Sequence, residues 1–247
     1  MKKENIEYLK LGLDNLSLTY NDEKIAIIED FYNDLIEFNT HTNLTRILDE
    51  KDFIDKHFFD SLSALKVLDE NKNLKIIDIG TGAGFPLMPL HIFYPEIEAT
   101  FVDSVNKKLD FIRNFSEKLV SKYNFKKENI KIVHSRAEDL AKDKNFREKY
   151  DVVISRAVSK LASLTELNMP FIKKQGSFIA MKSYDCDEEL KEAEKIIKLI
   201  GGEFDKCLKF DLIGNEIKRA LIVIKKLNNT PNIFPRKSGF AQKDPII

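Results

Sequence analysis

The sequence has few of the residues that build disulfide frameworks and metal sites. It carries only two cysteines, Cys186 and Cys207, among 247 residues. They are isolated from each other along the chain, and neither has the spacing of a metal-ligand pair. The histidines show no ligand spacing such as His-x-x-x-His (His41, His57, His91 and His134). We therefore expect two passive thiols, no disulfide framework and no bound metal.

Long apolar runs are also absent. No stretch approaches the roughly 18 to 20 uninterrupted apolar residues of a membrane span. The start of the chain, Met1 to Asn5, leads into a charged amphipathic pattern without the apolar region of a signal peptide. Hydrophobic residues make up 43% and charged residues 32%, which is typical of a soluble globular protein. These features predict a cytoplasmic protein with no membrane partner.

Neither sign of charge is in excess, since 40 Lys and Arg stand against 40 Asp and Glu. This balance is not that of an obvious nucleic-acid binder. From Lys218 onward, however, Asp244 is the only acid among several bases (Lys218, Arg219, Lys225, Lys226, Arg236, Lys237 and Lys243). A local basic patch fits contact with a polyanion. The alternative is a lysine-rich solvated edge.

The first 70 residues show helical rather than strand patterns. Apolar residues recur at helical spacing in two segments, on either side of a polar break at Asn39 to Asn43 (Ile25 to Ile28 with Phe31, Leu35 and Phe38; Phe53 with Phe58, Leu62, Leu65 and Leu68). We interpret residues 1–70 as a helical N-terminal extension packed against the main sheet.

From Leu74 onward, strand and helix patterns alternate. The predicted strands are Lys75 to Ile79, Ala99 to Val102, Ile130 to Val133, Asp151 to Ile154, Ser177 to Lys182, Phe204 to Lys209 and Arg219 to Lys225. The predicted helices are Phe85 to Phe93, Asn106 to Lys122, Lys160 to Ile172 and Cys186 to Leu199. Such alternation favours an α/β domain over residues 71–227, with a mostly parallel sheet and an antiparallel hairpin at one edge. Residues 228–247 contain three prolines and predict a basic, extended, non-helical strap.

The most informative run is Asp78-Ile79-Gly80-Thr81-Gly82-Ala83-Gly84-Phe85, which follows an apolar strand. A strand that turns through glycines into a helix forms a nucleotide-type pocket in α/β sheets. The spacing is Gly-x-Gly-x-Gly, and Phe85 occupies the third glycine position of the dinucleotide fingerprint. Asp78 would repel a pyrophosphate but suits a cationic ligand that carries an amino acid. The run therefore favours S-adenosylmethionine over NAD, although a tight structural turn remains the alternative.

A second cofactor signal lies downstream. The predicted strand from Ala99 to Val102 ends at Asp103, about 20 residues past the glycines, where doubly wound folds place an acid against ribose hydroxyls. The alternative role for Asp103 is a helix N-cap. Between loop and acid, Pro86 can occupy the first turn of a helix, where its missing N–H costs nothing.

Two further stretches follow strands at the same predicted edge of the sheet. Arg136-Ala137-Glu138 comes after the third strand, where a loop would pass beside an adenine ring. Helix capping is the alternative role for Glu138. Ser155-Arg156-Ala157-Val158 comes after the fourth strand, so Arg156 faces the crevice in which open α/β sheets bind ligands. Its planar fork suits a cofactor carboxylate, an RNA phosphate or a guanine edge.

Taken in order, these residues resemble the RsmG family, also called GidB, whose bacterial members methylate a guanine at N7 in 16S ribosomal RNA. The resemblance covers nearly the whole chain (Asn43-Leu44-Thr45, His57-Phe58-Phe59-Asp60-Ser61-Leu62, Asp78 to Pro86, Val102-Asp103-Ser104, Arg136-Ala137-Glu138, Ser155 to Val158, Thr230-Pro231, Phe234 to Lys237, Gly239, Lys243 and Pro245-Ile246). Leu87, Met88 and Ser183 depart from residues that are frequent in the family.

The resemblance implies a Rossmann-like methyltransferase fold, S-adenosylmethionine as cofactor, and the 530-loop region of 16S RNA, naked or in an assembling subunit, as partner. It implies cofactor contacts at Gly80, Phe85, Ala137, Glu138 and Arg156. To these we add Asp78, Gly82, Gly84 and Asp103 for the cofactor, and Arg219, Arg236, Lys237 and Lys243 for RNA. Arg156 is also the predicted catalytic residue, which positions cofactor and base. The resemblance implies no oligomeric state.

The remaining chemistry agrees with a ring-nitrogen acceptor. No Asn-Pro-Pro-Tyr-type loop follows the fourth strand, which disfavours methylation of exocyclic amines, and no cysteine is placed for attack on a pyrimidine. Guanine N7 carries no proton, so its methylation needs positioning rather than a general base. Two alternatives stay open: a methyltransferase for a small molecule or protein, and a non-catalytic RNA-binding factor on a degenerate fold.

Overall fold

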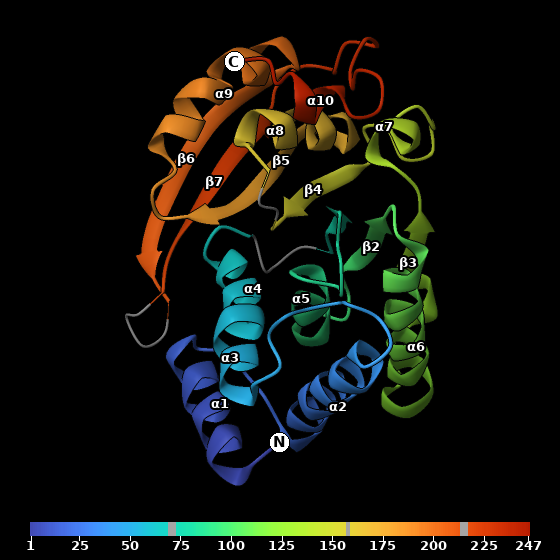
Figure 1. Ribbon diagram of the computed structural model, residues 1–247, viewed down its shortest axis with the longest axis vertical. Coiled ribbons are helices and arrows are strands. Elements are labelled where there is room, and N and C mark those ends of the chain that lie inside the picture. The colour runs from blue at the N-terminus through green and yellow to red at the C-terminus, as the bar shows by residue number, and fades with distance from the viewer. Residues whose placement is uncertain (69–72, 157–158, 213–216) are drawn as a thin grey trace.

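The computed structural model describes residues 1–68, 73–156, 159–212 and 217–247 (Figure 1). The motif residues Ala157 and Val158, and the boundary expected at residues 70 and 71, lie outside this part of the chain. None of the described helices is long and apolar enough to cross a membrane.

A seven-stranded sheet organises the molecule, in the order β3-β2-β1-β4-β5-β7-β6. The strands β1 to β5 are parallel, whereas β7 pairs antiparallel with both β5 and β6. Their bounds are β1 (Lys75–Ile79), β2 (Glu98–Asp103), β3 (Ile130–His134), β4 (Tyr150–Ser155), β5 (Ile172–Ser183), β6 (Gly202–Asp211) and β7 (Lys218–Lys226). The predicted fold class, a mostly parallel sheet with an antiparallel edge, is confirmed.

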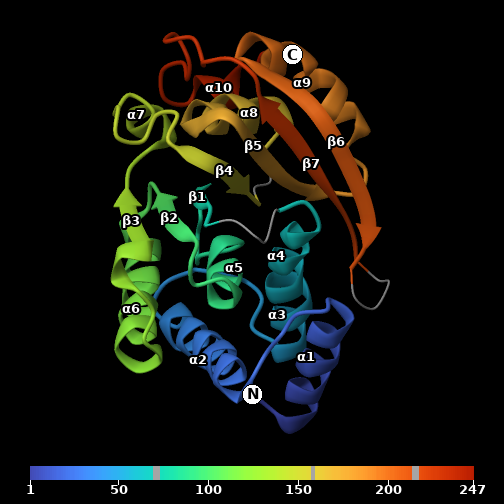
Figure 2. The same ribbon diagram turned by 180° about the vertical axis from the view of Figure 1, so that it is seen from behind.

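Helices cover both faces of the sheet, as Figures 1 and 2 show from opposite sides. One face carries α7, α8 and α9, and the other carries α5, α6 and the N-terminal helices. Their bounds are α5 (Leu87–Phe93), α6 (Asn106–Tyr123), α7 (Ala137–Leu140), α8 (Leu161–Asn168) and α9 (Asp187–Leu199). Because side chains alternate along a strand, neighbouring residues enter different cores: Ile76 and Ile154 face the first, Ile77 and Val153 the second.

The regular elements in the described part of the N-terminal extension are all helical, and loops at residues 16–21 and 40–49 connect them. These elements are α1 (Lys3–Asn15), α2 (Asp22–Asn39), α3 (Glu50–Phe53), the π-helix η1 (Ile54–Phe59), α4 (Asp60–Leu62) and the 3₁₀ turn η2 (Ser63–Lys66). The extension joins the main core through aromatic rings, since Phe31 contacts both Phe85 and Phe115 at ring-centroid distances of 5.4 and 4.7 Å. Gly12 brings α1 against η1, because a Cβ at this position would collide with the Phe59 ring.

Three local predictions need correction. The helix expected over residues 160–172 ends at Asn168, because Pro170 lies in the 3₁₀ turn η4 (Met169–Phe171) before β5. The helix α5 begins at Leu87, so Pro86 precedes the first turn rather than occupying it. The C-terminal strap is not wholly extended, since α10 (Phe240–Lys243) forms one turn after Gly239, whose φ is +81°.

Candidate active site

The glycine run forms a tight loop at the carboxyl end of β1. The N–H groups of Gly80 and Thr81 both donate to the Val102 carbonyl, at 2.8 and 3.0 Å, which fixes the loop to β2. Gly80 and Gly82 have φ values of +77° and +59°, and no atom lies within 4 Å of where their Cβ atoms would stand. The loop therefore leaves an open cradle into which a ligand can approach the backbone.

Asp103 closes this loop from the neighbouring strand. Its Oδ2 accepts from the Gly82 N–H at 3.0 Å, and its Oδ1 accepts from the Val105 N–H at 2.9 Å. The side chain is buried at 5% exposure but reaches the wall of a cavity of about 250 Å³. A carboxylate offers about four lone pairs, so two remain for hydroxyl donors. Asp103 therefore orders the loop and faces the cavity, and it is not the N-cap of α6, since that position belongs to Val105 and has no side-chain cap bond.

The opposite wall of this cavity comes from α7 and from the C-terminal strap. Ala137 and Glu138 line it, and Glu138 Oε1 accepts from the Gly239 N–H at 2.9 Å. Gly239 and Gln242 complete the wall. The strap expected to serve RNA therefore also encloses the cofactor side of the molecule.

The cavity fits an adenosyl cofactor. It lies at the carboxyl ends of parallel strands, beside β1. From β1 the chain runs outward to β2 and β3 and then returns to β4 on the other side of β1, and open sheets bind nucleotides at this reversal of strand order. Asp103 would hold the ribose hydroxyls, and Ala137 and Glu138 would lie beside the adenine. The glycine cradle leaves room for the amino-acid part.

Asp78 lies behind the loop and not in the cavity wall. It is fully buried, and its Oδ2 accepts from the Thr81 hydroxyl at 2.7 Å. Burial raises the pKa of the Asp78 carboxyl to about 8, against the lowering effects of Thr81 and Arg156. In this arrangement Asp78 supports the loop, and a cation brought close to it would favour its ionised form.

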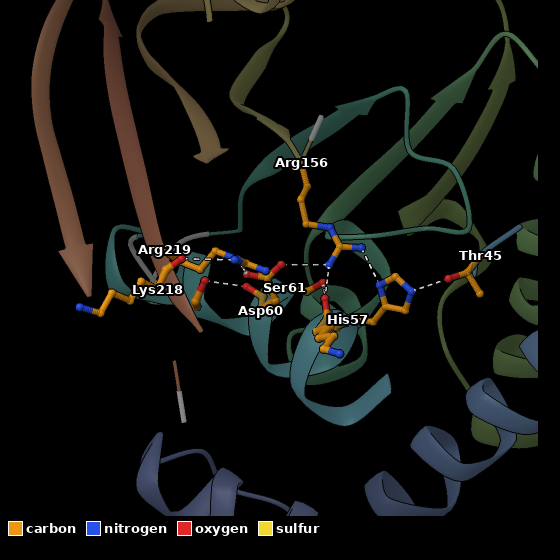
Figure 3. A network of polar contacts seen from close by, with 9 residues as sticks. Thr45, His57, Asp60, Ser61, Arg156, Lys218 and Arg219 are labelled. Carbon is orange, nitrogen blue, oxygen red and sulfur yellow. Dashed lines mark hydrogen bonds and ion pairs between the residues drawn. The ribbon is translucent and has the colours of Figure 1, made fainter. Parts of the chain in front are cut away.

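Arg156 is held by the N-terminal extension (Figure 3). Its Nη1 donates to the Lys56 carbonyl at 2.9 Å and to Asp60 Oδ2 at 3.2 Å, and its Nη2 donates to His57 Nδ1 at 2.9 Å. The guanidinium carbon lies 5.1 Å from the centroid of the Phe85 ring. Three of its five N–H groups thus fix its position through both Nη atoms, which a lysine ammonium could not reproduce.

His57 is neutral in this network. Burial, and then the charge of Arg156, lower its pKa to about 3. Because Nδ1 accepts from Arg156, the proton resides on Nε2, which lies 2.8 Å from Thr45 Oγ1. The ring also stacks on Phe85 at 4.4 Å with an interplanar angle of 9°. His57 therefore links Arg156 to the glycine-loop side of the site.

Asp60 joins Arg156 to a second arginine. Its Oδ1 accepts from Arg219 Nε at 2.9 Å, while Oδ2 faces Arg156. The carboxylate is almost fully buried, with a side-chain exposure of 4%. Figure 3 shows the two arginines approaching Asp60 from different strands. They open onto a second cavity of about 500 Å³, which Met181, Lys182 and Glu189 also line.

The basic strap residues divide into two kinds. Arg236 makes a bidentate ion pair with the buried Glu166, through Nε at 3.0 and 3.1 Å and Nη2 at 2.8 Å. Lys237 and Lys243 are exposed and form no ion pair with any described residue. Arg236 therefore anchors the strap, and the two lysines keep their charges for a partner. Arg219 is intermediate, since it is paired with Asp60 but lines the second cavity.

The sequence predictions thus fall into two neighbouring groups. Gly80, Asp103, Ala137 and Glu138 share the first cavity, whereas Arg156 and Phe85 belong to the network beside the second. Gly84 packs toward Met88. The sequence patterns indicated no role for His57, Asp60, Lys182 or Glu189. The signal for the first two was present, since both belong to the quoted run from His57 to Leu62.

Comparison with known proteins identifies the family of the chain. The GidB family model, described as rRNA small subunit methyltransferase G, matches residues 24–220. The chain is 42% identical to ribosomal RNA small subunit methyltransferase G of Desulforamulus reducens, over 96% of this chain and 97% of the relative. It is 39% identical to the protein of that name from Bacillus subtilis, over 98% and 99%.

Among solved structures, a 16S rRNA (adenine(1408)-N(1))-methyltransferase mutant with cosubstrate SAM, from Catenulisporales acidiphilia, is similar in fold. Its TM-score is 0.50 at 11% identity, over 66% of this chain and 94% of that one. The family match and the near-complete coverage of the relatives together show that the chain belongs to the GidB family of small-subunit rRNA methyltransferases.

Proposed function

We propose that this protein transfers a methyl group from S-adenosylmethionine to N7 of a guanine in the 530-loop region of 16S ribosomal RNA, in the cytoplasm. The observation that carries the proposal is the cavity enclosed by the glycine loop, Asp103, Ala137 and Glu138, beside the Arg156 network. Family membership supports the class of reaction and is consistent with guanine N7 as the acceptor, and the residues of the site agree with an acceptor that needs no general base.

The reaction needs a nucleophile with a free lone pair. Guanine N7 has one, so the bond to the methyl carbon can form while the carbon–sulfur bond breaks and its electrons stay on sulfur. No proton leaves N7, and no general base is required. When bound, S-adenosylmethionine supplies the methyl group and a neutral thioether leaving group. The protein contributes position, which alone can lower a barrier by several kcal/mol, up to about 7–11.

The residues that flank the cavity fit this task. Arg156 cannot act as a base, because a guanidinium stays protonated in proteins. It is held in place by Lys56, His57 and Asp60. It lines the second cavity and follows β4, the neighbour of β1 in the sheet. We assign it the role of holding the cofactor and the target base in line.

We infer the RNA-binding surface from the basic side chains that line the second cavity or form no ion pair among the described residues. Lys237 and Lys243 lie on the strap next to the cofactor cavity, where they would contact RNA phosphates. Arg219 would contact the target nucleotide from the second cavity. The partner is 16S RNA or a partly assembled small subunit.

Mass spectrometry of ribosomal RNA from cells with and without this protein tests the proposal. We expect one guanosine of 16S RNA to lose its N7 methyl group in the deletion strain. Purified protein, small subunits and labelled S-adenosylmethionine should restore the modification. Retained cofactor binding without methylation of small-subunit RNA would refute the proposal, as would a methyl group on an exocyclic amine or a carbon.

A further inference from the structure

The wall of the second cavity contains an ion pair, Lys182 with Glu189, that has no role in the proposed methyl transfer. Lys182 Nζ lies 2.7 Å from Glu189 Oε2. The lysine is buried, with 5% of its side chain exposed, whereas 29% of the Glu189 side chain is exposed toward the cavity side. The cavity of about 500 Å³ falls within the range of small-molecule sites, roughly 300–1,000 Å³.

The pair retains one donor and one acceptor. Lys182 Nζ also donates to the Ser159 carbonyl at 2.9 Å, which leaves one of its three N–H groups. Glu189 Oε2 also accepts from the Leu161 N–H at 2.8 Å. Among the described residues, Glu189 Oε1 has no hydrogen-bond donor. An N–H donor of Lys182 and the acceptor Glu189 Oε1 therefore lie side by side.

The order of the strands shows which member of the pair lies nearer to the cofactor cavity. The cofactor cavity lies at β1 and β2, Arg156 follows β4, Lys182 lies on β5, and Glu189 belongs to α9 beyond it. A guanine presents N7, then the acceptor O6, then the donors N1–H and the N2 amino group around its edge. With N7 directed toward the cofactor, O6 falls toward Lys182 and N1–H toward Glu189.

We propose that Lys182 and Glu189 read the Watson–Crick edge of the target guanine, with the Lys182 ammonium donating to O6 and the Glu189 carboxylate accepting from N1–H and the N2 amino group. This inference rests on the proposed function. Because these edges are buried in duplexes, it requires an unpaired or extruded nucleotide, as is usual for RNA bases that proteins read.

The pair would also exclude adenine. With adenine N7 at the same place, the exocyclic amino group would meet the Lys182 ammonium, so two donors would face each other. The acceptor N1 would meet the Glu189 carboxylate. A site built for hydrogen bonds rejects a base that leaves its buried polar groups unpaired.

The test compares guanosine with inosine, which lacks only the N2 amino group. Small subunits are reconstituted with 16S RNA that carries either nucleoside at the methylated position, and single-turnover rates are measured at subsaturating RNA. The variant is Glu189→Gln. The carboxylate has one oxygen for Leu161 N–H and Lys182 and a second for the base, whereas the amide has only one oxygen for all three donors. The control is Glu188→Gln, an exposed residue on the same turn of α9.

We expect wild type and Glu188→Gln to prefer guanosine by about tenfold or more, and Glu189→Gln to methylate guanosine about 10- to 100-fold more slowly. The preference for guanosine should then approach one, with unchanged cofactor affinity. A slower Glu189→Gln that keeps the wild-type preference would mean a purely structural ion pair and overturn the inference. An unchanged rate would overturn it as well. Absence of transfer by wild type would instead refute the proposed function, and the inference with it.

Discussion

Arg156 and Asp60 meet across 96 residues of sequence, with Arg156 Nη1 lying 3.2 Å from Asp60 Oδ2. The other carboxylate oxygen holds Arg219 at 2.9 Å. One buried acid of the N-terminal extension thus balances two guanidinium groups from β4 and β7. The extension is therefore part of the site, because it determines where the predicted catalytic arginine lies.

Asp60→Asn should be strongly destabilising. The amide keeps the shape but leaves two partly buried cations without a counter-charge, and breaking a buried pair costs about 3–5 kcal/mol. Urea unfolding measures the change. The matched control is Asp52→Asn, whose exposed pair with Lys56 should contribute less than about 1 kcal/mol. Equal losses in the two variants would contradict this assignment.

Arg156→Lys should reduce turnover strongly although it keeps the charge. The ammonium cannot contact the Lys56 carbonyl, Asp60 and His57 at the same time. Single-turnover methylation with saturating cofactor measures the effect, and wild type should show no base ionisation between about pH 6.5 and 8.5. Full activity in the variant would refute the positioning role.

Asp103→Ala should weaken cofactor binding by one or more orders of magnitude. It removes charge-assisted hydrogen bonds of about 1.5–3 kcal/mol each and releases the Gly82 N–H. Calorimetry with S-adenosylmethionine is the measurement, with Ser104→Ala in the same cavity wall as the control. Equal dissociation constants for wild type and Asp103→Ala would exclude the ribose role.

The double variant Lys237→Ala, Lys243→Ala should bind RNA more weakly with unchanged cofactor affinity. Loss of two phosphate contacts should make the salt dependence shallower by roughly one to two units of log–log slope. The control is the double variant Lys2→Ala, Lys3→Ala at the start of α1, which lies at the opposite end of the molecule from α10 (Figure 1). The same loss of RNA affinity in both double variants would indicate a general charge effect.

Deletion from Pro235 onward has a different expected result. Since Gly239 and Gln242 line the cofactor cavity, the truncated protein should lose cofactor affinity as well as RNA affinity. The basic residues of the strap would by themselves account for a loss of RNA affinity only.

Because of His57, the free energy of unfolding should decrease as the pH is lowered. The folded pKa of His57 is lowered to about 3, so between pH 6.5 and 3 the unfolded chain binds a proton that the folded protein excludes. The contribution is fully present above pH 6.5 and is lost below it. His57→Gln should remove about 1.4 kcal/mol per pH unit from the slope of unfolding free energy between pH 6 and 5. An unchanged slope in urea titrations would contradict the neutral, buried ring.

The hydrophobic pattern of the sequence was sufficient to predict the strands of the sheet, because each buried strand is a short apolar run bounded by turn residues. It also located Asp103 and Ala137, since both follow strands whose carboxyl ends meet at one edge. It could not show that Arg236 is neutralised by Glu166, which lies 70 residues away. Nor could it show that Cys186 and Cys207 lie with their sulfurs 3.8 Å apart, contrary to their isolation in sequence.

The network around Asp60 illustrates the same limit. A carboxylate in a helical segment is normally a solvated residue, and the periodicity could not show that Arg156 and Arg219 approach Asp60 in the fold and pair with it. The α10 turn was missed for a related reason, since a helix of four residues is too short to show a hydrophobic period.

The contact between Glu138 and Gly239 has a consequence for the order in which the protein matures. The wall of the cofactor cavity needs residues as late as Gln242, while the glycine loop is complete soon after residue 85. A polypeptide still being synthesised therefore has the loop but not the enclosed cavity. The cavity can therefore close only after Gln242 has been synthesised and the strap has folded against α7, so the proposed cofactor site forms later than the glycine loop.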